Sequence, residues 1–326
     1  MEIDTQFPTK LQTISDAPEP LRSALVDGVL SGEPVRLLVH SPAFLVGDEK
    51  LPATVLAVTK NGWLLASETE DGGATLQKSD FGDILFLDLK SILLSGWLRI
   101  SFAAVDALSS ATVRFETVWD EFYHEAIELM LAGSDPALPA AVETGRNEAS
   151  TFEDWPMKFR NEAQRYWPKG QPLLAAVQWP ATVDELQGQI APAGALLITG
   201  RELVLILDEK ESSGKESSTE EPKERRTEQA APPRSEASPE TLLVPAAEDA
   251  DVDSGQLPGD VYEFGENILF VPRVRLRGFD VSHREHFAVL TLEIHAVHGG
   301  EKLEVVFPSD HEKDVLKAMK QVSLSP

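Results

Sequence analysis

One stretch of this sequence occurs twice. Residues Leu21–Ala43 align without a gap on residues Phe159–Ala181. The identical residues that meet in this alignment include Arg22 and Arg160, Gly32 and Gly170, Pro34 and Pro172, Val39 and Val177, and Pro42 and Pro180. A repeat that recurs after roughly 140 residues is long enough to be a whole domain rather than one unit of a solenoid. The sequence therefore predicts two copies of one fold.

The repeat continues into a β-hairpin. Val55–Thr59 corresponds to Ala195–Thr199, and each stretch is followed by a polar turn and then a second apolar run, at Trp63–Ala66 and Leu203–Leu207. Aliphatic runs on both sides of a short polar turn are typical of paired strands. We therefore expect the same hairpin in both copies.

Both copies end in a similar way. Asp80–Ile92 resembles Glu263–Leu276, and further strands are expected after each stretch. Amphipathic helices are then predicted at about Val118–Leu131 and Asp310–Val322, because apolar residues recur there at spacings of three and four. Each copy is thus expected to close with a helix.

The order of the elements predicts the fold class. Each copy opens with a predicted helix, at about Pro18–Leu30 and Met157–Tyr166. A helix, several strands in hairpin succession and a closing helix predict an α+β fold that is mainly β. We expect two antiparallel sandwiches or half-barrels, each closed by its C-terminal helix.

At this point the chain resembles the bacterial pleckstrin-homology-like (PH-like) domains. The residues that carry the resemblance are VLAVTKNGWLLAS and ALLITGRELVLIL, the strand pair around Ile84–Trp97, and the two closing helices. The resemblance covers nearly the whole chain outside one acidic segment. It implies a tandem binding or scaffolding module without conserved catalytic machinery. Since this fold is used for lipids, peptides and proteins, the resemblance does not identify the ligand.

The predicted domain organisation has a break in the second copy. We expect an N-terminal tail at residues 1–16, a first domain at 17–133, a linker at 134–154 and a second domain at 155–326, interrupted at about 208–260. The linker is rich in Ala, Pro and Glu and is expected to be extended. The interrupting segment is rich in Glu, Ser, Pro and Lys, and we expect it to be a disordered acidic insertion at a hairpin tip.

Composition limits the class of protein. The chain has 326 residues, 42% of them hydrophobic and 25% charged, which is enough for two cores of ordinary size. No apolar stretch approaches the length of a membrane span, and no secretory signal is visible. There is no cysteine, so disulfides, thiolate metal ligands and cysteine nucleophiles are excluded. A cytoplasmic location fits this composition.

The net charge of -25 disfavours attachment to nucleic acids and to anionic membranes. The first hairpin loop of each copy, Phe44–Pro52 and Thr182–Pro192, lacks the basic cluster of the phosphoinositide-binding members of the wider pleckstrin-homology class. We therefore expect no phosphoinositide site there. Within the acidic insertion, Leu242–Val244 is the only aliphatic cluster, and it is either a docking peptide or an accident of composition.

One basic feature stands out in the second copy. Arg273, Arg275 and Arg277 alternate with aliphatic residues, and Arg284 follows soon after. On a strand this spacing would place three guanidinium groups on one face. The stretch is then either a solvated outer face or a binding surface for phosphate, an acidic peptide or the protein's own acidic insertion.

The second candidate surface is aromatic. Trp155, Phe159, Tyr166 and Trp167 cluster around the opening helix of the second copy. Packing is the usual role of aromatic residues at helical spacing, and we expect this helix to wedge between the two domains. The alternative is an exposed partner site, because protein interfaces favour Trp and Tyr.

Histidines raise the question of a metal site. His283, His286, His295 and His298 lie close together in the sequence, but residues three apart on a strand point to opposite faces, so solvated turn histidines are expected instead. The helical stretch that begins at His124 resembles the start of a zincin helix, but Glu128 stands where the second histidine would be. We expect no metal and no cofactor.

No catalytic motif is present in the sequence. The sequence therefore predicts a non-enzymatic binding or scaffolding protein that recognises another protein or an acidic peptide through its second domain. Two alternatives remain open at this stage, a peripheral membrane lipid-binding protein and a cryptic metal-dependent hydrolase.

Overall fold

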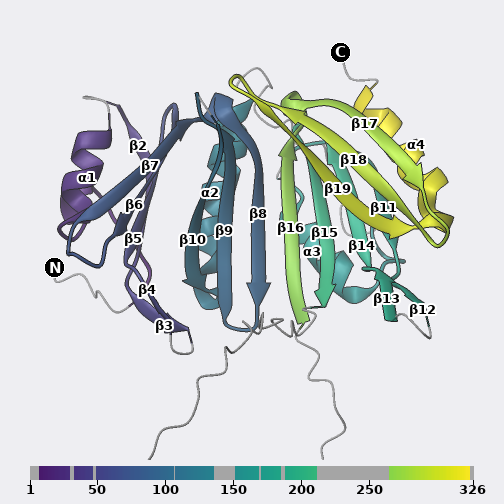
Figure 1. Cartoon of the computed structure of the whole chain (residues 1–326), viewed down its shortest axis with the longest axis horizontal. Coiled ribbons are helices and arrows are strands. Elements are labelled where there is room, and N and C mark those ends of the chain that lie inside the picture. Colours follow the sequence, from purple (N-terminus) through teal and green to yellow (C-terminus); the bar gives the residue numbers. More distant parts are fainter. Residues whose placement is uncertain are drawn as a thin grey trace, which may run out of the picture. The chain divides into compact units, whose positions relative to one another are not determined.

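The structure is a computed structural model that describes residues 7–29, 33–46, 49–105, 107–135, 151–168, 170–184, 188–210 and 264–323. Within these ranges the chain is mainly β and its sheets are antiparallel, with four α-helices (Figure 1). The mainly β prediction is therefore confirmed.

A seven-stranded sheet contains strands from both copies. Its order is β10-β9-β8-β16-β15-β14-β11 (Figure 1). The strands are β8 (Ile84–Ile92), β9 (Ser95–Ala103), β10 (Leu108–Glu116), β11 (Leu173–Trp179), β14 (Gly194–Thr199), β15 (Glu202–Lys210) and β16 (Phe264–Pro272). The junction between the copies is the β8–β16 pair, which runs from Ile92 opposite Gly265 to Leu87 opposite Phe270. The two copies are thus joined by one hydrogen-bonded ladder.

The remaining strands form smaller sheets. The first copy has a five-stranded sheet in the order β1-β2-β5-β6-β7, and the second has a three-stranded sheet in the order β17-β18-β19. A short hairpin, β3–β4 or β12–β13, follows the first long strand of each copy. The strands are β1 (Thr9–Lys10), β2 (Val35–Ser41), β3 (Phe44–Val46), β4 (Glu49–Leu51), β5 (Thr54–Thr59), β6 (Gly62–Glu68), β7 (Ala74–Asp80), β12 (Thr182–Asp184), β13 (Gly188–Ala191), β17 (Leu276–His283), β18 (Phe287–His295) and β19 (Gly300–Pro308).

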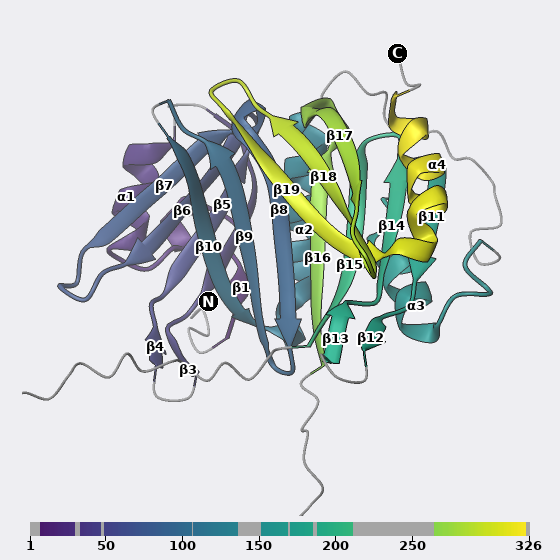
Figure 2. The ribbon, with the colours of Figure 1, turned by 45° about the vertical axis from the view of Figure 1, so that its right-hand side comes forward.

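The four helices lie at the ends of the copies, near the predicted positions (Figure 2). They are α1 (Leu21–Gly28), α2 (Asp120–Ser134), α3 (Met157–Tyr166) and α4 (Glu312–Ser323). Helix α2 buries Tyr123, Ile127 and Met130, whose spacing of four and three puts them on one side. None of the helices in the described part of the chain has the length and apolar content that crossing a membrane requires.

The later part of each copy, from the last strand of its first sheet onward, aligns differently from the sequence prediction. The 3₁₀ turn η2 (Phe81–Asp83) precedes β8, and η5 (Arg273–Arg275) precedes β17, so β16 takes the place of β7 in the second copy. The predicted match of Asp80–Ile92 with Glu263–Leu276 is therefore wrong. Both stretches are apolar runs after an acidic residue, and similar letters do not decide which strand a segment pairs with.

With this correction, the second part of each copy aligns without a gap. The same number of residues separates η2 from η5, η3 (Thr117–Trp119) from η6 (Ser309–His311), and the first residue of α2 from that of α4. The fully buried Tyr123 and Ile127 of α2 then correspond to the fully buried Val315 and Met319 of α4. This alignment identifies equivalent positions in the two copies residue by residue.

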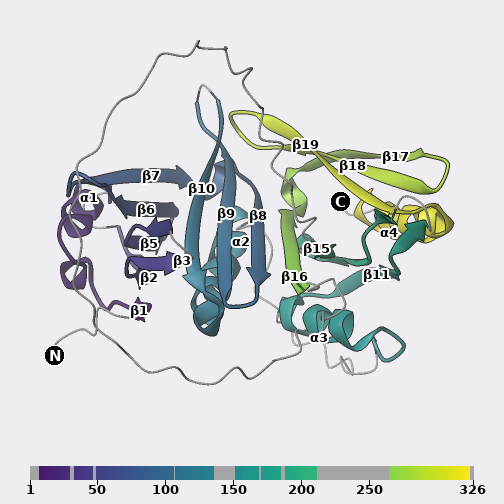
Figure 3. The ribbon, with the colours of Figure 1, turned by 60° about the horizontal axis from the view of Figure 1, so that its bottom comes forward.

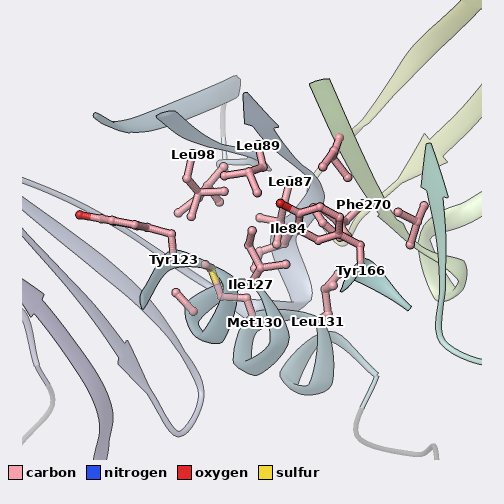
Figure 4. Close-up of a cluster of buried hydrophobic side chains, with 14 of the residues drawn as sticks. Ile84, Leu87, Leu89, Leu98, Tyr123, Ile127, Met130, Leu131, Tyr166 and Phe270 are labelled. Atoms are coloured by element: carbon pink, nitrogen blue, oxygen red, sulfur yellow. The ribbon is translucent and has the colours of Figure 1, made fainter. Parts of the chain in front are cut away.

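The largest core also joins the copies. Leu87, Leu98 and Ile127 of the first copy pack in one cluster with Tyr166 and Phe270 of the second (Figure 4). The rings of Tyr166 and Phe270 are 5.6 Å apart and edge to face. Helices α2 and α3 thus cover the same side of the seven-stranded sheet, and β17–β19 with α4 cover its other side over the second copy's strands (Figure 3).

Two predicted boundaries differ from the structure. The described part of the predicted tail, from Phe7 onward, contains β1, which pairs with β2, and Leu11 is buried. At the end of the predicted linker, Phe152 is fully buried in the shared core. Both segments are held by apolar side chains that burial stabilises.

The acidic insertion was predicted to begin at about residue 208, but 208–210 belong to β15; residues 211–263 lie outside the described part of the chain. The strands on either side of it, β15 and β16, are paired to their ends, with Lys210 opposite Phe264. The segment between them therefore connects two adjacent ends of one antiparallel hairpin.

Candidate binding groove at the edge of the central sheet

The predicted arginine strand is wrong. β16 ends at Pro272, which cannot donate to a sheet ladder, and the chain turns into η5 before β17 begins. Arg275 is 8% exposed, and it donates from Nε to the Ile84 carbonyl and from Nη2 to the Phe81 carbonyl, both at 3.1 Å. This guanidinium group therefore ties the second copy to the first instead of facing a ligand.

The other three arginines do not form an array with it. Arg273 donates from Nη1 to the carbonyls of Thr199 and Gly200, each at 3.0 Å. Arg277 lies on β17 and Arg284 in the turn that follows, and both are exposed. Burial lowers the pKa of the Arg273 guanidinium group. Two of the four arginines therefore bind backbone carbonyls, and the other two lie at separate exposed positions.

The aromatic residues of the second copy's opening helix pack inward. Phe159 is 4% and Tyr166 2% exposed, while Trp155 and Trp167 pack against the shared core. An ion pair from Arg165 Nη2 to Asp120 Oδ2, 2.5 Å long, links α3 to α2. Phe159 and Tyr166 therefore have packing roles, whereas Trp155 and Trp167 are half-buried and a partner surface at these two stays a prediction.

The four histidines lie at hairpin ends, and two of them have a carboxylate within hydrogen-bond distance. His283 Nδ1 is 3.0 Å from Glu312 Oε2, and His298 Nδ1 is 2.8 Å from Asp83 Oδ1. Across the described ranges, no group of three or more His, Asp or Glu side chains is arranged to hold a metal ion.

The acidic residue of the zincin-like stretch has a structural partner. Glu128 Oε2 accepts from Arg201 Nη2 at 2.9 Å, and Arg201 Nε also lies 2.5 Å from Glu202 Oε2. Burial raises the pKa of Glu202, and the charge of Arg201 opposes this effect. This buried cluster joins the β14–β15 turn of the second copy to α2 of the first.

The site that the structure offers instead lies at β11, an outermost strand of the seven-stranded sheet. Among the described residues, no strand pairs with the outer edge of β11. Beside this edge, a groove of about 450 Å³ separates β11 from α4. It is lined by Leu174–Gln178 on the strand and by His311, Asp314, Lys317, Ala318 and Gln321 at and along the helix.

In the first copy the equivalent place is filled by the chain itself. β1 adds to β2 as an antiparallel strand, with Thr9 opposite His40 and Lys10 opposite Val39. The Leu11 amide continues the ladder and donates to the Leu38 carbonyl at 3.0 Å. The short segment thus closes the edge of the first copy's sheet.

The side chains of this segment contact the helix that closes the first copy. Lys10 forms an ion pair with Glu125 of α2, and its Nζ lies 5.0 Å from the centre of the Phe122 ring. Phe7 lies against Trp119, with 6.3 Å between ring centres. Glu125, Phe122 and Trp119 are the residues that Lys317, Asp314 and His311 replace in the second copy. All three replacements line the open groove.

Strands β2 and β11 share details of their backbones. Each has an irregularity at the equivalent place, between Val35 and Leu37 in β2 and between Leu173 and Ala175 in β11. Leu37–Ser41 are all buried, whereas the corresponding residues from Ala175 to Gln178 are only half-buried. Part of this difference comes from the segment beside β2, since Leu38 lies in one buried cluster with Leu11 and with Leu21 of α1.

The groove therefore has the features of a site for an added strand. By equivalence with Leu38 and His40, the backbone groups of Ala176 and Gln178 point to the open edge. Lys317 offers a positive charge where the first copy has the negative charge of Glu125. The arrangement can hold an extended peptide by backbone hydrogen bonds and discriminate among side chains by charge.

Comparison of the chain with protein-family models and with curated proteins gives no match. The sequence does not reveal the groove, because residues 1–16 are predicted to be a tail, and the strand that this segment adds to β2 is a tertiary pairing. The repeat could have indicated the groove, since aligning α2 with α4 makes Lys317 the equivalent of Glu125.

Proposed function

We propose that this chain is a non-catalytic binding protein that holds an extended segment of another protein between β11 and α4. The observation that supports this proposal is β1, a segment that occupies the equivalent groove of the first copy. The same backbone edge and the same helix position exist in the second copy, where the described residues leave the groove open. Strand addition to an exposed sheet edge is a common way for a protein to bind a peptide.

We also propose that each copy is a PH-like sandwich. Four strands in one sheet, a 3₁₀ turn, three further antiparallel strands and a closing helix occur in this order in both copies, which supports the resemblance. The proposal concerns the scaffold, and the function rests on the groove.

The groove is lined by one lysine, Lys317, and one carboxylate, Asp314, and we propose that an acidic residue of the partner segment lies beside Lys317. Lys10 of the first copy meets Glu125, so a residue at the same place on a strand added to β11 would meet Lys317. An acidic side chain there would form the inverse ion pair. We therefore propose that the second domain recognises an acidic peptide, as predicted, but through the groove between β11 and α4 and not through the arginine residues.

Two synthetic peptides test the proposal. One has the sequence of residues 7–13, Phe-Pro-Thr-Lys-Leu-Gln-Thr, and in the other the Lys is replaced by Glu. Binding to the full chain is followed by shifts of backbone amide signals in NMR spectra. We expect the Glu peptide to shift signals of β11 and α4 and to bind about threefold more tightly than the Lys peptide, as an exposed ion pair allows.

Three variants provide the controls. Lys317→Glu should reverse the preference, whereas Lys313→Glu, the same charge change on α4 outside the groove, should leave it unchanged. Gln178→Pro removes one outward amide and should abolish binding while the melting temperature stays the same. Shifts confined to other elements, or equal peptide preference in Lys317→Glu and in the parent chain, would contradict the proposal.

The chain itself holds a competing sequence. In the alignment of Leu21–Ala43 with Phe159–Ala181, extended toward the N-terminus, Glu148 corresponds to Lys10. A chain with residues 136–150 replaced by Gly and Ser in equal number tests this competitor. Equal peptide affinity for both chains supports an external partner, and binding only after the replacement would assign the groove to the chain's own segment.

A further inference from the structure

The outer edges of β7 and β17 have no partner strand among the described residues. β7 is the last strand of the first copy's five-stranded sheet, and β17 is the first strand of the second copy's three-stranded sheet. Each is paired on one side, β7 with β6 and β17 with β18. An open strand edge is a template for pairing with another chain.

The equivalents of these two edges are paired with each other inside the chain. β8 follows η2 as β17 follows η5, and β16 takes the place of β7 in the second copy. β8 and β16 form the antiparallel ladder that joins the first copy to the second. Each copy thus contributes one of its two edges to the internal junction and leaves the other open.

Burial differs between the paired strands and the open ones. Ile84–Leu89 of β8 are all buried, whereas no residue of β17 is buried. The residues of β16 from Asn267 to Pro272 are likewise buried, and none of β7 is. The open strands therefore keep exposed surface that an added strand would cover.

The edge of β17 offers backbone groups for hydrogen bonding. In the β17–β18 hairpin the Arg284 amide donates to the Phe287 carbonyl at 2.8 Å. Bonded and non-bonded pairs alternate along an antiparallel ladder, so the backbone groups of Phe279 and Val281 point away from β18.

The edge of β7 has the same arrangement. The Phe81 amide donates to the Asn61 carbonyl at 3.0 Å, so the backbone groups of Leu76 and Lys78 point away from β6. Both strands therefore present these groups at the positions that the β8–β16 ladder uses. The register of that ladder would pair two residues of each open edge, Val281 with Leu76 and Phe279 with Lys78.

The closing helix leaves room for a strand beside β17. At the end of β17, His283 Nδ1 lies 3.0 Å from Glu312 Oε2 of α4. The equivalent residues of the first copy, Ser91 and Asp120, line one pocket together with Glu266 of β16. The edge of β8 is therefore paired although α2 begins beside it, and α4 has the equivalent position beside β17.

The two open edges also carry opposite charges. Continued by two residues, the same register places Arg277 of β17 opposite Asp80 of β7. Both side chains are exposed, and Arg277 forms no ion pair within the described residues. The equivalent residues at the internal junction are Leu85 and Pro272, so the charges are specific to the open edges. An ion pair between them would favour this register over others.

We propose that chains of this protein associate head to tail, with β17 of one chain added to β7 of the next in the register of the β8–β16 ladder. The partner is a second copy of this chain, because the same two edges already pair where the copies meet. Repetition of such a contact builds a ring or an open filament. This interface is separate from the β11 groove and does not depend on the function proposed for that groove.

Sedimentation velocity measures the association of the full chain, in about 0.15 M salt so that repulsion from the net charge of -25 is screened. The mean mass of the parent should rise with protein concentration. Val281→Pro removes an outward amide of β17, and Lys78→Pro removes one of β7, so each variant alone should stay monomeric. A mixture of the two should form dimers and nothing larger, because only one open edge of each kind remains.

Charge variants provide a second test that changes only exposed side chains. Arg277→Glu and Asp80→Arg should each weaken association about fivefold, and a mixture of the two should associate as the parent does. Lys302→Glu makes the same charge change on β19, which β18 separates from β17, and should leave association unchanged.

The proposal is overturned if the parent keeps the mass of a single chain at every concentration. It is also overturned if either proline variant, folded by circular dichroism, associates alone as the parent does, or if Lys302→Glu loses as much association as Arg277→Glu. Dimers of Lys78→Pro alone would show that two β17 edges pair with each other instead.

Discussion

Single buried charges in this protein hold elements together. Arg275 donates to carbonyls of the first copy, and Arg201 joins Glu202 to Glu128. Glu162 on α3 is a different case, since it is 9% exposed and lies near Glu266. Burial, and then the charge of Glu266, raises the pKa of Glu162 to about 7 from its ordinary value of 4.5.

This shift predicts a pH dependence of stability. Between pH 4.5 and about 7 the folded chain binds a proton at Glu162 that the unfolded chain releases. The free energy of unfolding should therefore fall as the pH rises through this window, and the loss is complete above it. Glu162→Gln removes the ionising group, so at pH 8 the variant should be about 1–3 kcal/mol more stable than the parent, and the difference should shrink toward pH 4.5.

Urea unfolding at several pH values measures this effect. Glu285→Gln is the matched control, because Glu285 is 89% exposed, and its pH dependence should equal that of the parent. A Glu162→Gln variant with the same pH dependence as the parent would show that Glu162 is not the group responsible.

At the scale of elements, the two copies differ most at one hairpin. In the first copy, β6 and β7 are joined by Thr69–Gly73, a turn in which Gly72 has a φ of 80° and the Thr69 amide donates to the Gly73 carbonyl at 3.0 Å. In the second copy, the equivalent strands β15 and β16 end with Lys210 opposite Phe264. The same turn should therefore close either pair.

Grafting this turn tests the equivalence of the two hairpins. A chain with residues 211–263 replaced by Thr-Glu-Asp-Gly-Gly should be more stable by about 2 kcal/mol, because a shorter loop loses less entropy on closure. Urea unfolding measures the change. Replacing the same residues by five alanines should stabilise the chain by about 1 kcal/mol less than the native turn does, since alanine does not readily adopt the positive φ of Gly72. A grafted chain less stable than the parent would mean that β15 and β16 do not end as a simple hairpin.

At the scale of the whole described unit, the copies share backbone and core. The β8–β16 pair continues the sheet across the junction, and the cluster around Leu87 and Phe270 contains side chains from both copies. Neither copy can lose its structure without exposing apolar surface of the other. The described residues outside the insertion are therefore expected to unfold together.

Hydrogen exchange tests this cooperativity. Leu98→Ala removes a fully buried side chain of the first copy and should cost about 3 kcal/mol. Amides of β14 and β15 in the second copy should lose as much protection as those of β9. Val297→Ala, at a side chain that is 73% exposed, should change neither. Unaltered protection of β14 and β15 in Leu98→Ala would mean that the copies unfold separately.

The sequence by itself determined the repeat, the helices and the hairpins. Each of these depends on residues a few positions apart, such as the spacing of Tyr123, Ile127 and Met130 on α2 or the polar turn between β5 and β6. These local patterns were sufficient for the mainly β class and for the approximate bounds of α2, α3 and α4.

Only the tertiary structure decided how the copies combine and where a ligand can bind. The shared sheet, the position of Arg275 and the equivalence of β16 with β7 depend on which distant strands pair, and backbone hydrogen bonds carry no sequence signature of their partner. The candidate groove has the same origin. The pairing of β1 with β2 places Lys10 beside Glu125, the residue equivalent to Lys317, and no strand is paired in this way to β11 among the described residues.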